Sequence, residues 1–154
     1  MHALELRIPP PIVTVIVAAA MWTISLAAPA ADKPALLVRL ALTIVIALAG
    51  VAMGVSGVVA FRRARTTPNP LKPETASTLV TNGVYRLTRN PMYVGLALVL
   101  VAWGVFLYSA WASLGPVAFV LYITRFQIVP EERVLADLFG AGYAAYRAKV
   151  RRWL

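Results

Sequence analysis

The stretch Gly83-Val-Tyr-Arg-Leu-Thr-Arg-Asn-Pro-Met-Tyr-Val-Gly95 joins a long polar loop to a long apolar segment. Asn90 before Pro91 predicts a helix start. Asparagine is a favoured N-cap, and proline at the first helical position gives up only an N–H that has no partner there. Arg89 lies just outside the apolar run, and Tyr93 marks the same boundary. Taken alone, the stretch predicts a capped membrane helix with a basic, aromatic rim.

The composition around this stretch is that of a membrane protein. The 154 residues predict a single domain, of which 60% are hydrophobic and only 14% charged. There is no cysteine, and the one histidine is residue 2, so we expect neither thiolate chemistry nor a metal site. The net charge of +9 is better explained by basic residues that flank membrane spans and meet anionic lipid than by nucleic acid.

Uncharged runs predict an all-α, polytopic membrane protein with about four transmembrane helices, near residues 12–28, 40–61, 92–108 and 112–128. The first run also resembles a signal peptide, but its length favours a retained helix. The last two spans share one uncharged run that is too long for a single bilayer crossing, so a turn is expected around 109–113.

Two features are expected within these spans. Gly50 and Gly54 place small residues four apart, which lets two helices approach closely. We interpret this first as packing within the chain, with a homodimer as the alternative use of that face. Gly115-Pro116 is expected to open the fourth helix, and Arg125 to end it.

The regions outside the spans are strongly basic. A cytoplasmic loop is expected over 62–90, in which Pro68, Pro70 and Pro73 predict a stiff, extended path. Arginine and lysine also crowd the end of the chain, whereas the hairpin between the last two spans has none. The positive-inside rule therefore places both termini and the loop in the cytoplasm. The expected location is a bacterial-type inner membrane.

The end of the chain predicts one more helix. Pro130 is expected to begin a tail helix over 131–150, with Glu131 and Glu132 in a first turn that favours negative charge. Gly140 and Gly142 are expected to break it. Its apolar stripe and basic end predict a helix that lies at the cytoplasmic membrane surface.

Two blocks of sequence resemble one known family. The first is Gly-x-Tyr-Arg-x-x-Arg-Asn-Pro-Met-Tyr-x-Gly over 83–95, and the second is Glu-Glu-x-x-Leu followed by Phe-Gly-x-x-Tyr-x-x-Tyr over 131–146. Both are similar to blocks of the integral-membrane methyltransferases that include isoprenylcysteine carboxyl methyltransferase and phosphatidylethanolamine N-methyltransferase. Two blocks in this order, separated by an uncharged hairpin, are more specific than either alone, and the resemblance extends over roughly 40–154.

The resemblance implies a site for S-adenosyl-L-methionine that opens to the cytoplasm. The expected cofactor-binding residues are Tyr85, Arg89, Asn90, Pro91, Tyr93, Gly95, Glu131, Glu132 and Tyr143. These residue types are suited to binding the cofactor. Arginine can hold a carboxylate in a bidentate pair, a carboxylate can bind ribose hydroxyls or an ammonium group, and tyrosines can pack on adenine or the sulfonium.

The acceptor is expected to be a lipophilic or lipid-like molecule that enters from the bilayer. Isoprenylcysteine-type carboxyl O-methylation is preferred, because a carboxylate is already a nucleophile and needs only an arginine such as Arg125 to orient it. The alternative is N-methylation of a phospholipid or amine, which needs a base, for which Glu131 or Glu132 would serve. The expected catalytic residues are therefore Arg125 and Glu132.

Two observations on site residues and two rival functions keep other interpretations open. Asn90 stands where the family usually has histidine, which puts any acid–base role of that position in doubt. Glu131 and Glu132 are also explained as a favourably charged helix start. A small four-helix transporter for cationic compounds is a non-enzymatic alternative, although the uncharged runs lack the carboxylate that such transporters generally need. A membrane reductase that uses a nicotinamide cofactor is a third candidate.

Overall fold

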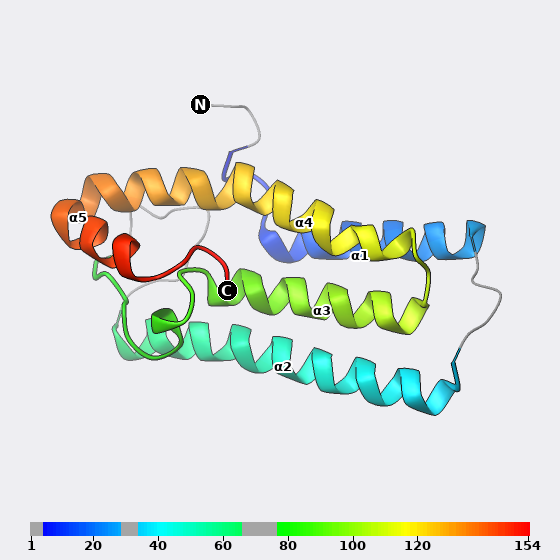
Figure 1. Ribbon diagram of the computed structural model, residues 1–154. Helices are drawn as coiled ribbons and strands as arrows, with labels where there is room; N and C mark the ends of the chain where they lie inside the picture. The colour runs from blue at the N-terminus through cyan, green and yellow to red at the C-terminus, as the bar shows by residue number, and fades with distance from the viewer. Residues whose placement is uncertain (1–4, 29–33, 66–76) are drawn as a thin grey trace.

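The computed structural model describes residues 5–28, 34–65 and 77–154, and within these residues the regular structure is entirely helical (Figure 1). In chain order the elements are α1 (Pro10–Ala27), α2 (Leu36–Arg63), the 3₁₀ helix η2 (Gly83–Arg86), α3 (Pro91–Leu107), the 3₁₀ helix η3 (Ala112–Leu114), α4 (Gly115–Ile123), the π-helix η4 (Thr124–Ile128) and α5 (Val129–Lys149). The prolines at 68, 70 and 73, expected to stiffen the long loop, lie outside the described residues.

The long helices form an antiparallel bundle. α2 packs against α3, and α1 packs against α3 and α4 (Figure 1). α1, α2 and the continuous helix Ala112–Lys149 are each long and apolar enough to cross a membrane, and α3 is a shorter apolar helix. Gly50 and Gly57 are the buried residues of α2, so most of its apolar side chains face outward, as expected for a helix in lipid. The expected all-α, membrane-spanning fold is confirmed.

A close contact joins Gly50 of α2 to Gly95 of α3. A Cβ on Gly50 would lie 2.7 Å from the Gly95 carbonyl oxygen, and a Cβ on Gly95 would lie 2.6 Å from the Gly50 carbonyl oxygen. Neither distance leaves room for a side chain, so the absence of one at both positions lets the two backbones touch. The close helix packing within the chain that was expected at Gly50 is therefore confirmed.

Gly54 has a different part in this contact. Gly54 takes part in the expected close contact, but a Cβ on Gly54 would meet no atom within 4 Å, so the expectation that a side chain there would clash is wrong. Its backbone nitrogen lies 2.9 Å from a Cβ built on Gly95. Residues four apart lie on one face of a helix but do not point in the same direction, because a turn takes 3.6 residues. The Cβ direction of Gly50 is therefore toward α3, whereas Gly54 contacts α3 with its backbone atoms.

The hairpin between α3 and α4 lies where the sequence predicts it. Tyr108 has a left-handed conformation (φ 50°), and its N–H donates to the Gly104 carbonyl at 2.9 Å, which closes the end of α3. α4 begins at Gly115, with Pro116 in its first turn. The expected turn around 109–113 and the expected start at Gly115-Pro116 are both confirmed.

The fourth span continues without interruption into α5. We expected Arg125 to end the fourth helix and Pro130 to begin a separate helix over 131–150; this is wrong. In the π-helix η4 the Val129 N–H bonds to the Thr124 carbonyl, five residues earlier. A wider π turn accommodates a proline whose ring would clash with the carbonyl of an ordinary α turn. Proline therefore marks a change of helix type here rather than a helix start.

α5 reverses direction at Gly140. Gly140 has φ 47° and ψ −121°, a conformation that glycine adopts without strain. The expected break is confirmed at Gly140, whereas Gly142 continues the helix. Beyond the turn, Tyr143 and Tyr146 pack in a buried cluster with Tyr85. The second half of α5 thus runs back toward the bundle, and the following residues end beside the start of α3 (Figure 1).

Candidate active site

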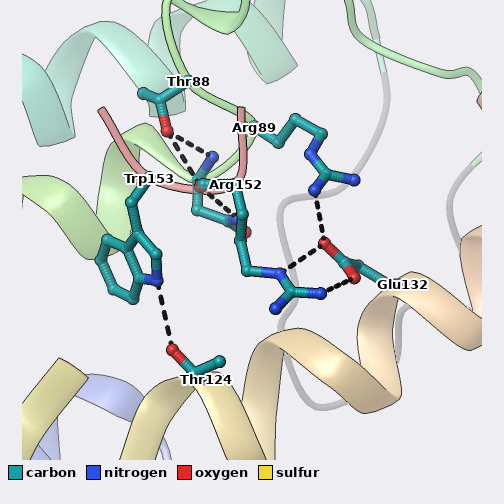
Figure 2. Close-up of polar contacts among 7 residues, drawn as sticks. Thr88, Arg89, Thr124, Glu132, Arg152 and Trp153 are labelled. Atoms are coloured by element: carbon teal, nitrogen blue, oxygen red, sulfur yellow. Dashed lines mark hydrogen bonds and ion pairs between the residues drawn. The ribbon is translucent and has the colours of Figure 1, made fainter. Parts of the chain in front are cut away.

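Arg89 and Glu132 form an ion pair at the end of the bundle where α3 begins. The Nη2 atom of Arg89 lies 3.1 Å from Oε1 of Glu132, and the two side chains are only 9% and 10% exposed (Figure 2). Arg89 lies two residues before the first residue of α3, whereas Glu132 belongs to the first turn of α5. The fold therefore joins one residue from each of the two blocks of sequence that carry the family resemblance.

A second arginine binds the same carboxylate. Arg152 donates from Nε to Oε1 of Glu132 at 3.0 Å and from Nη2 to Oε2 at 2.6 Å, a bidentate pair (Figure 2). These hydrogen bonds raise the pKa of Arg152 above its ordinary value, so the guanidinium stays charged. Because Glu132 is shared by two arginines, the Arg89–Glu132–Arg152 cluster has a net charge of +1.

Residues 150–154 follow α5 and form a segment that we call the strap. The Arg89 N–H donates to the Arg151 carbonyl at 3.0 Å. Thr88 Oγ1 donates to the Arg152 carbonyl at 3.1 Å (Figure 2). Asn90 Nδ2 donates to the same carbonyl at 2.9 Å. The main chain of the strap is thereby fixed to the three residues that precede α3, independently of the Arg152 side chain.

Asn90 occupies the N-cap position of α3, and Pro91 follows in the first turn, as expected. The Asn90 side chain, however, makes no capping hydrogen bond. Its amide donates to the strap instead, and its own N–H is bound by Thr88 Oγ1 at 3.2 Å. The expectation of a side-chain cap is wrong because a carbonyl from a distant part of the chain competes for the amide, which local sequence does not reveal.

Trp153 fixes the far end of the strap. Its indole Nε1 donates to Thr124 Oγ1 at 3.2 Å (Figure 2), and its ring packs against the buried core that contains Tyr93 and Phe119. Thr124 is the first residue of the π-helix. The strap thus connects the start of α3 with the π-helical turn that leads into α5.

Tyr93 and Glu131 form a second polar pair on the same two elements. The Tyr93 hydroxyl donates to Oε1 of Glu131, and Gln127 also interacts with the hydroxyl. Tyr93 is buried and belongs to the first turns of α3, whereas Glu131 is the neighbour of Glu132 in α5. The two adjacent carboxylates therefore have different environments: Glu132 is held by two arginines and Glu131 by a tyrosine.

The remaining tyrosines of the site line the return of α5. The Tyr146 hydroxyl donates to the Tyr85 carbonyl at 2.7 Å, and the Tyr85 ring meets Phe61 edge-on at 5.4 Å. Burial raises the pKa of Tyr85 well above its ordinary value, so the phenol stays neutral. Tyr143 lies near enough to Arg89 to interact with its charge.

A cleft lies between the two halves of α5. Its volume is about 280 Å³, and it is lined by Ala136, Gly140, Tyr143, Ala144, Arg147 and Ala148. The alanines leave the space open, and Tyr143 links the cleft to the Arg89–Glu132–Arg152 cluster.

Two expected site residues have structural contacts elsewhere. Gly95 makes the close contact with α2 described above. Arg125 donates to Oε1 of Glu5 at 3.1 Å, and Arg133 donates to the same oxygen at 3.0 Å. Glu5 is buried, whereas Arg125 is 45% exposed. Arg125 is thus tied to the N-terminal segment, and its proposed catalytic role stays a prediction.

Sequence reasoning missed the partners that complete the site. Thr88, Arg152 and Trp153 carry much of the hydrogen bonding, and none was expected to. The one available signal was that the Arg151-Arg152-Trp153 run directly follows the second family block, where it was interpreted as part of a surface helix. Glu5 had no signal, because it lies in a short mixed segment far from its partners in sequence.

The Arg89 guanidinium has unused donors that fit a ligand carboxylate. Its Nε and Nη1 atoms are buried and have no hydrogen-bond partner within the part of the chain that the structure describes. Buried donors of this kind are costly when unpaired, and each of these N–H groups can donate a charge-assisted hydrogen bond to a ligand carboxylate. In the same part of the chain, no three side chains of the His, Cys, Asp or Glu type are grouped as metal ligands would be.

Comparisons with known proteins point in the same direction. The family model described as phospholipid methyltransferase matches residues 38–142. An uncharacterised protein of Haemophilus influenzae is 48% identical over 63 residues, which covers 41% of this chain and all of that protein. Probable protein-S-isoprenylcysteine O-methyltransferases of Oryza sativa, subspecies indica and japonica, are 40% identical over 79 residues, which covers 49% of this chain and 40% of each of those proteins. No solved structure matches.

These findings define the class of protein: an integral membrane protein of the methyltransferase type, with the polar residues of its candidate site gathered at one end of a helical bundle. More particularly, the chain belongs to the phospholipid methyltransferase family. The family resemblance of the two sequence blocks is therefore confirmed.

Proposed function

We propose that this protein transfers a methyl group from S-adenosyl-L-methionine to a lipid-like acceptor in the membrane. The observation that carries the proposal is the buried Arg89 guanidinium, with two unused donors, beside the carboxylate of Glu132. The amino-acid portion of the cofactor offers a carboxylate and an ammonium group, which are complementary to these two side chains. The family adds the methyltransferase activity itself.

Each part of the site has a role in holding the cofactor. Arg89 binds its carboxylate, Glu132 binds its ammonium group, and the cleft beside Tyr143 receives the nucleoside portion. When bound, the sulfonium supplies an electrophilic methyl group, so the reaction needs no metal and no covalent enzyme intermediate. The chain's own contribution is to orient the two reactants and to exclude water around them.

The different environments of Glu131 and Glu132 determine which of them could act as a base toward the methyl acceptor. Both oxygens of Glu132 are occupied by arginine donors, which leaves them poorly placed to take a proton from an acceptor. Glu131 is bound by Tyr93 and has no arginine in the described contacts, so it is the better candidate for a general base. A carboxylate acceptor, the preferred class, needs no base, whereas an amine acceptor needs Glu131.

We propose that the site faces the cytoplasm. The basic residues at the end of α2, before α3 and in the strap all lie at the same end of the bundle, which the positive-inside rule assigns to the cytoplasm. Because the chain has no native cysteine, Ser113→Cys in the α3–α4 hairpin and Ser77→Cys, at an exposed position before η2, are suitable labelling positions. An impermeant thiol reagent added outside should label Ser113→Cys alone, and the reverse pattern would invert the topology.

The activity is tested with the purified protein in detergent, a methyl-labelled cofactor and a membrane lipid extract. The wild-type protein is expected to transfer label into the lipid fraction. The Arg89→Ala variant is the matched control and should transfer none. Base treatment then distinguishes the acceptors, because a methyl ester releases methanol whereas an N-methyl group is stable. If no lipid fraction is labelled and calorimetry detects no binding of S-adenosylhomocysteine, the proposed function is wrong.

A further inference from the structure

Glu132 is held by two arginines that differ in their freedom to move. The Arg89 side chain is 9% exposed, whereas the Arg152 side chain is 35% exposed. Arg89 uses one nitrogen on Oε1, and Arg152 covers both oxygens. In Figure 2 the two guanidinium groups approach the carboxylate from different directions. A group that must reach Oε2 of Glu132 therefore competes with Arg152.

The Arg152 side chain can move away from Glu132 while the main chain of the strap stays in place. The strap is fixed by main-chain carbonyls of Arg151 and Arg152, which accept from Arg89, Thr88 and Asn90, and by the indole of Trp153. None of these bonds uses the Arg152 guanidinium. Rotation of a partly exposed side chain toward solvent thus breaks only its two bonds to Glu132.

Charge gives a reason for this rotation. With both arginines in place, the Arg89–Glu132–Arg152 cluster has a net charge of +1, which disfavours an ammonium group placed beside it. When Arg152 leaves, Arg89 and Glu132 remain as one cation and one anion, which match a carboxylate and an ammonium group on the same ligand. The Nε and Nη1 donors of Arg89 are unpaired already, so the carboxylate of the same ligand can bind them at the same time.

We propose that Arg152 is a built-in competitor for the ammonium group of the cofactor: its guanidinium occupies Glu132 in the free protein and is displaced when the amino-acid portion of the ligand binds. This inference rests on the proposed function, because it assumes that Glu132 receives the cofactor's ammonium group. It gives Arg152 a part in setting affinity that neither the family nor the two sequence blocks assign.

The first test measures affinity by calorimetry with S-adenosylhomocysteine on wild type, Arg152→Gln and Arg151→Gln. Arg152→Gln should bind about threefold to tenfold more tightly, because an internal competitor weakens apparent affinity by the fraction of molecules whose site is open. Arg151→Gln removes the same charge from the neighbouring, exposed position and should bind like wild type. 5′-Methylthioadenosine, which lacks the amino-acid portion, should show no difference between the variants.

The second test uses the unaltered protein, so that it stands even if Arg152→Gln fails to fold. Phenylglyoxal modifies accessible arginines, and mass spectrometry locates the modified residue. Saturating S-adenosylhomocysteine should accelerate modification of Arg152 and leave that of Arg151 unchanged.

The outcomes separate this inference from the proposed function. Weaker or equal binding by Arg152→Gln, or slower or unchanged modification of Arg152 with ligand, would overturn the competitor role while leaving the proposed cofactor site in place. No binding by wild type or by either variant would overturn both.

Discussion

The start of α3 is held in two contrasting ways. On one side, Gly95 touches Gly50 of α2 through bare backbone, and the contact depends on missing side chains. On the other, Arg89 and Asn90 are bound by Glu132 and the strap through hydrogen bonds and an ion pair. The first contact lies among apolar residues within the bundle, and the second lies at its basic end.

The difference teaches how each region depends on its surroundings. Packing between apolar helices in lipid gains mainly from van der Waals contact, so one added methyl group is enough to disturb it. The polar end depends on pairing, because a buried charge without its partner costs several kcal/mol. We therefore expect substitutions in the first region to affect stability, and substitutions in the second to affect ligand binding as well.

The largest effect is expected at the polar end. Arg89→Ala should weaken binding of S-adenosylhomocysteine by roughly 2–5 kcal/mol, because it removes a buried charged partner of the ligand. Arg86→Ala, at an exposed position three residues earlier, is the matched control and should bind like wild type. Calorimetry measures both, and equal affinity of the two variants would place the site elsewhere.

The apolar contact should respond through stability. In Gly50→Ala the new Cβ would lie 2.7 Å from the Gly95 carbonyl, so overpacking should lower the free energy of unfolding by roughly 1–3 kcal/mol. Gly54→Ala, whose Cβ meets nothing within 4 Å, should change it little. Thermal unfolding in detergent compares them, and equal melting temperatures would mean that α2 and α3 do not touch at Gly50.

A smaller effect is expected where the returning half of α5 is bound. Tyr146→Phe leaves the Tyr85 carbonyl without its buried donor and should cost about 1–2 kcal/mol of stability. Tyr108→Phe alters a tyrosine that is 42% exposed and serves as the control. If both variants unfold at the temperature of the wild type, the hydroxyl of Tyr146 is not needed to fix α5.

The smallest effect concerns the strap. Trp153→Phe keeps an aromatic ring but loses the hydrogen bond to Thr124, at a cost of about 0.5–1.5 kcal/mol. Hydrogen exchange at the Arg89 amide, which donates to the Arg151 carbonyl, should accelerate because the strap opens more often. Trp111→Phe, at an exposed position, should leave this amide unchanged; acceleration in both variants would show that the effect is not specific to the strap.

The sequence by itself determined the class of fold and several of the positions at which helices begin, turn or break. Uncharged, apolar runs of this length are typical of membrane spans. Within lipid they are helical, because lipid offers no hydrogen-bond partner to the backbone. Pro91 at the start of α3, the turn after Leu107 and the break at Gly140 followed from local backbone chemistry. Gly50 was recognisable as a packing position, because a residue without a side chain allows close approach wherever its helix packs.

Only the tertiary structure decided what the polar and ambiguous residues do. Pro130 fits a helix start or a π turn equally well, and the choice depends on the helix that precedes it. The Asn90 amide caps a helix unless a carbonyl such as that of Arg152 is brought to it, and Glu132 is a free carboxylate unless two arginines reach it. Hydrogen bonds and ion pairs act over a few ångströms, whereas their partners here are separated by 20 to 62 residues along the chain. No local pattern encodes such pairings, so the site forms only when the chain has folded.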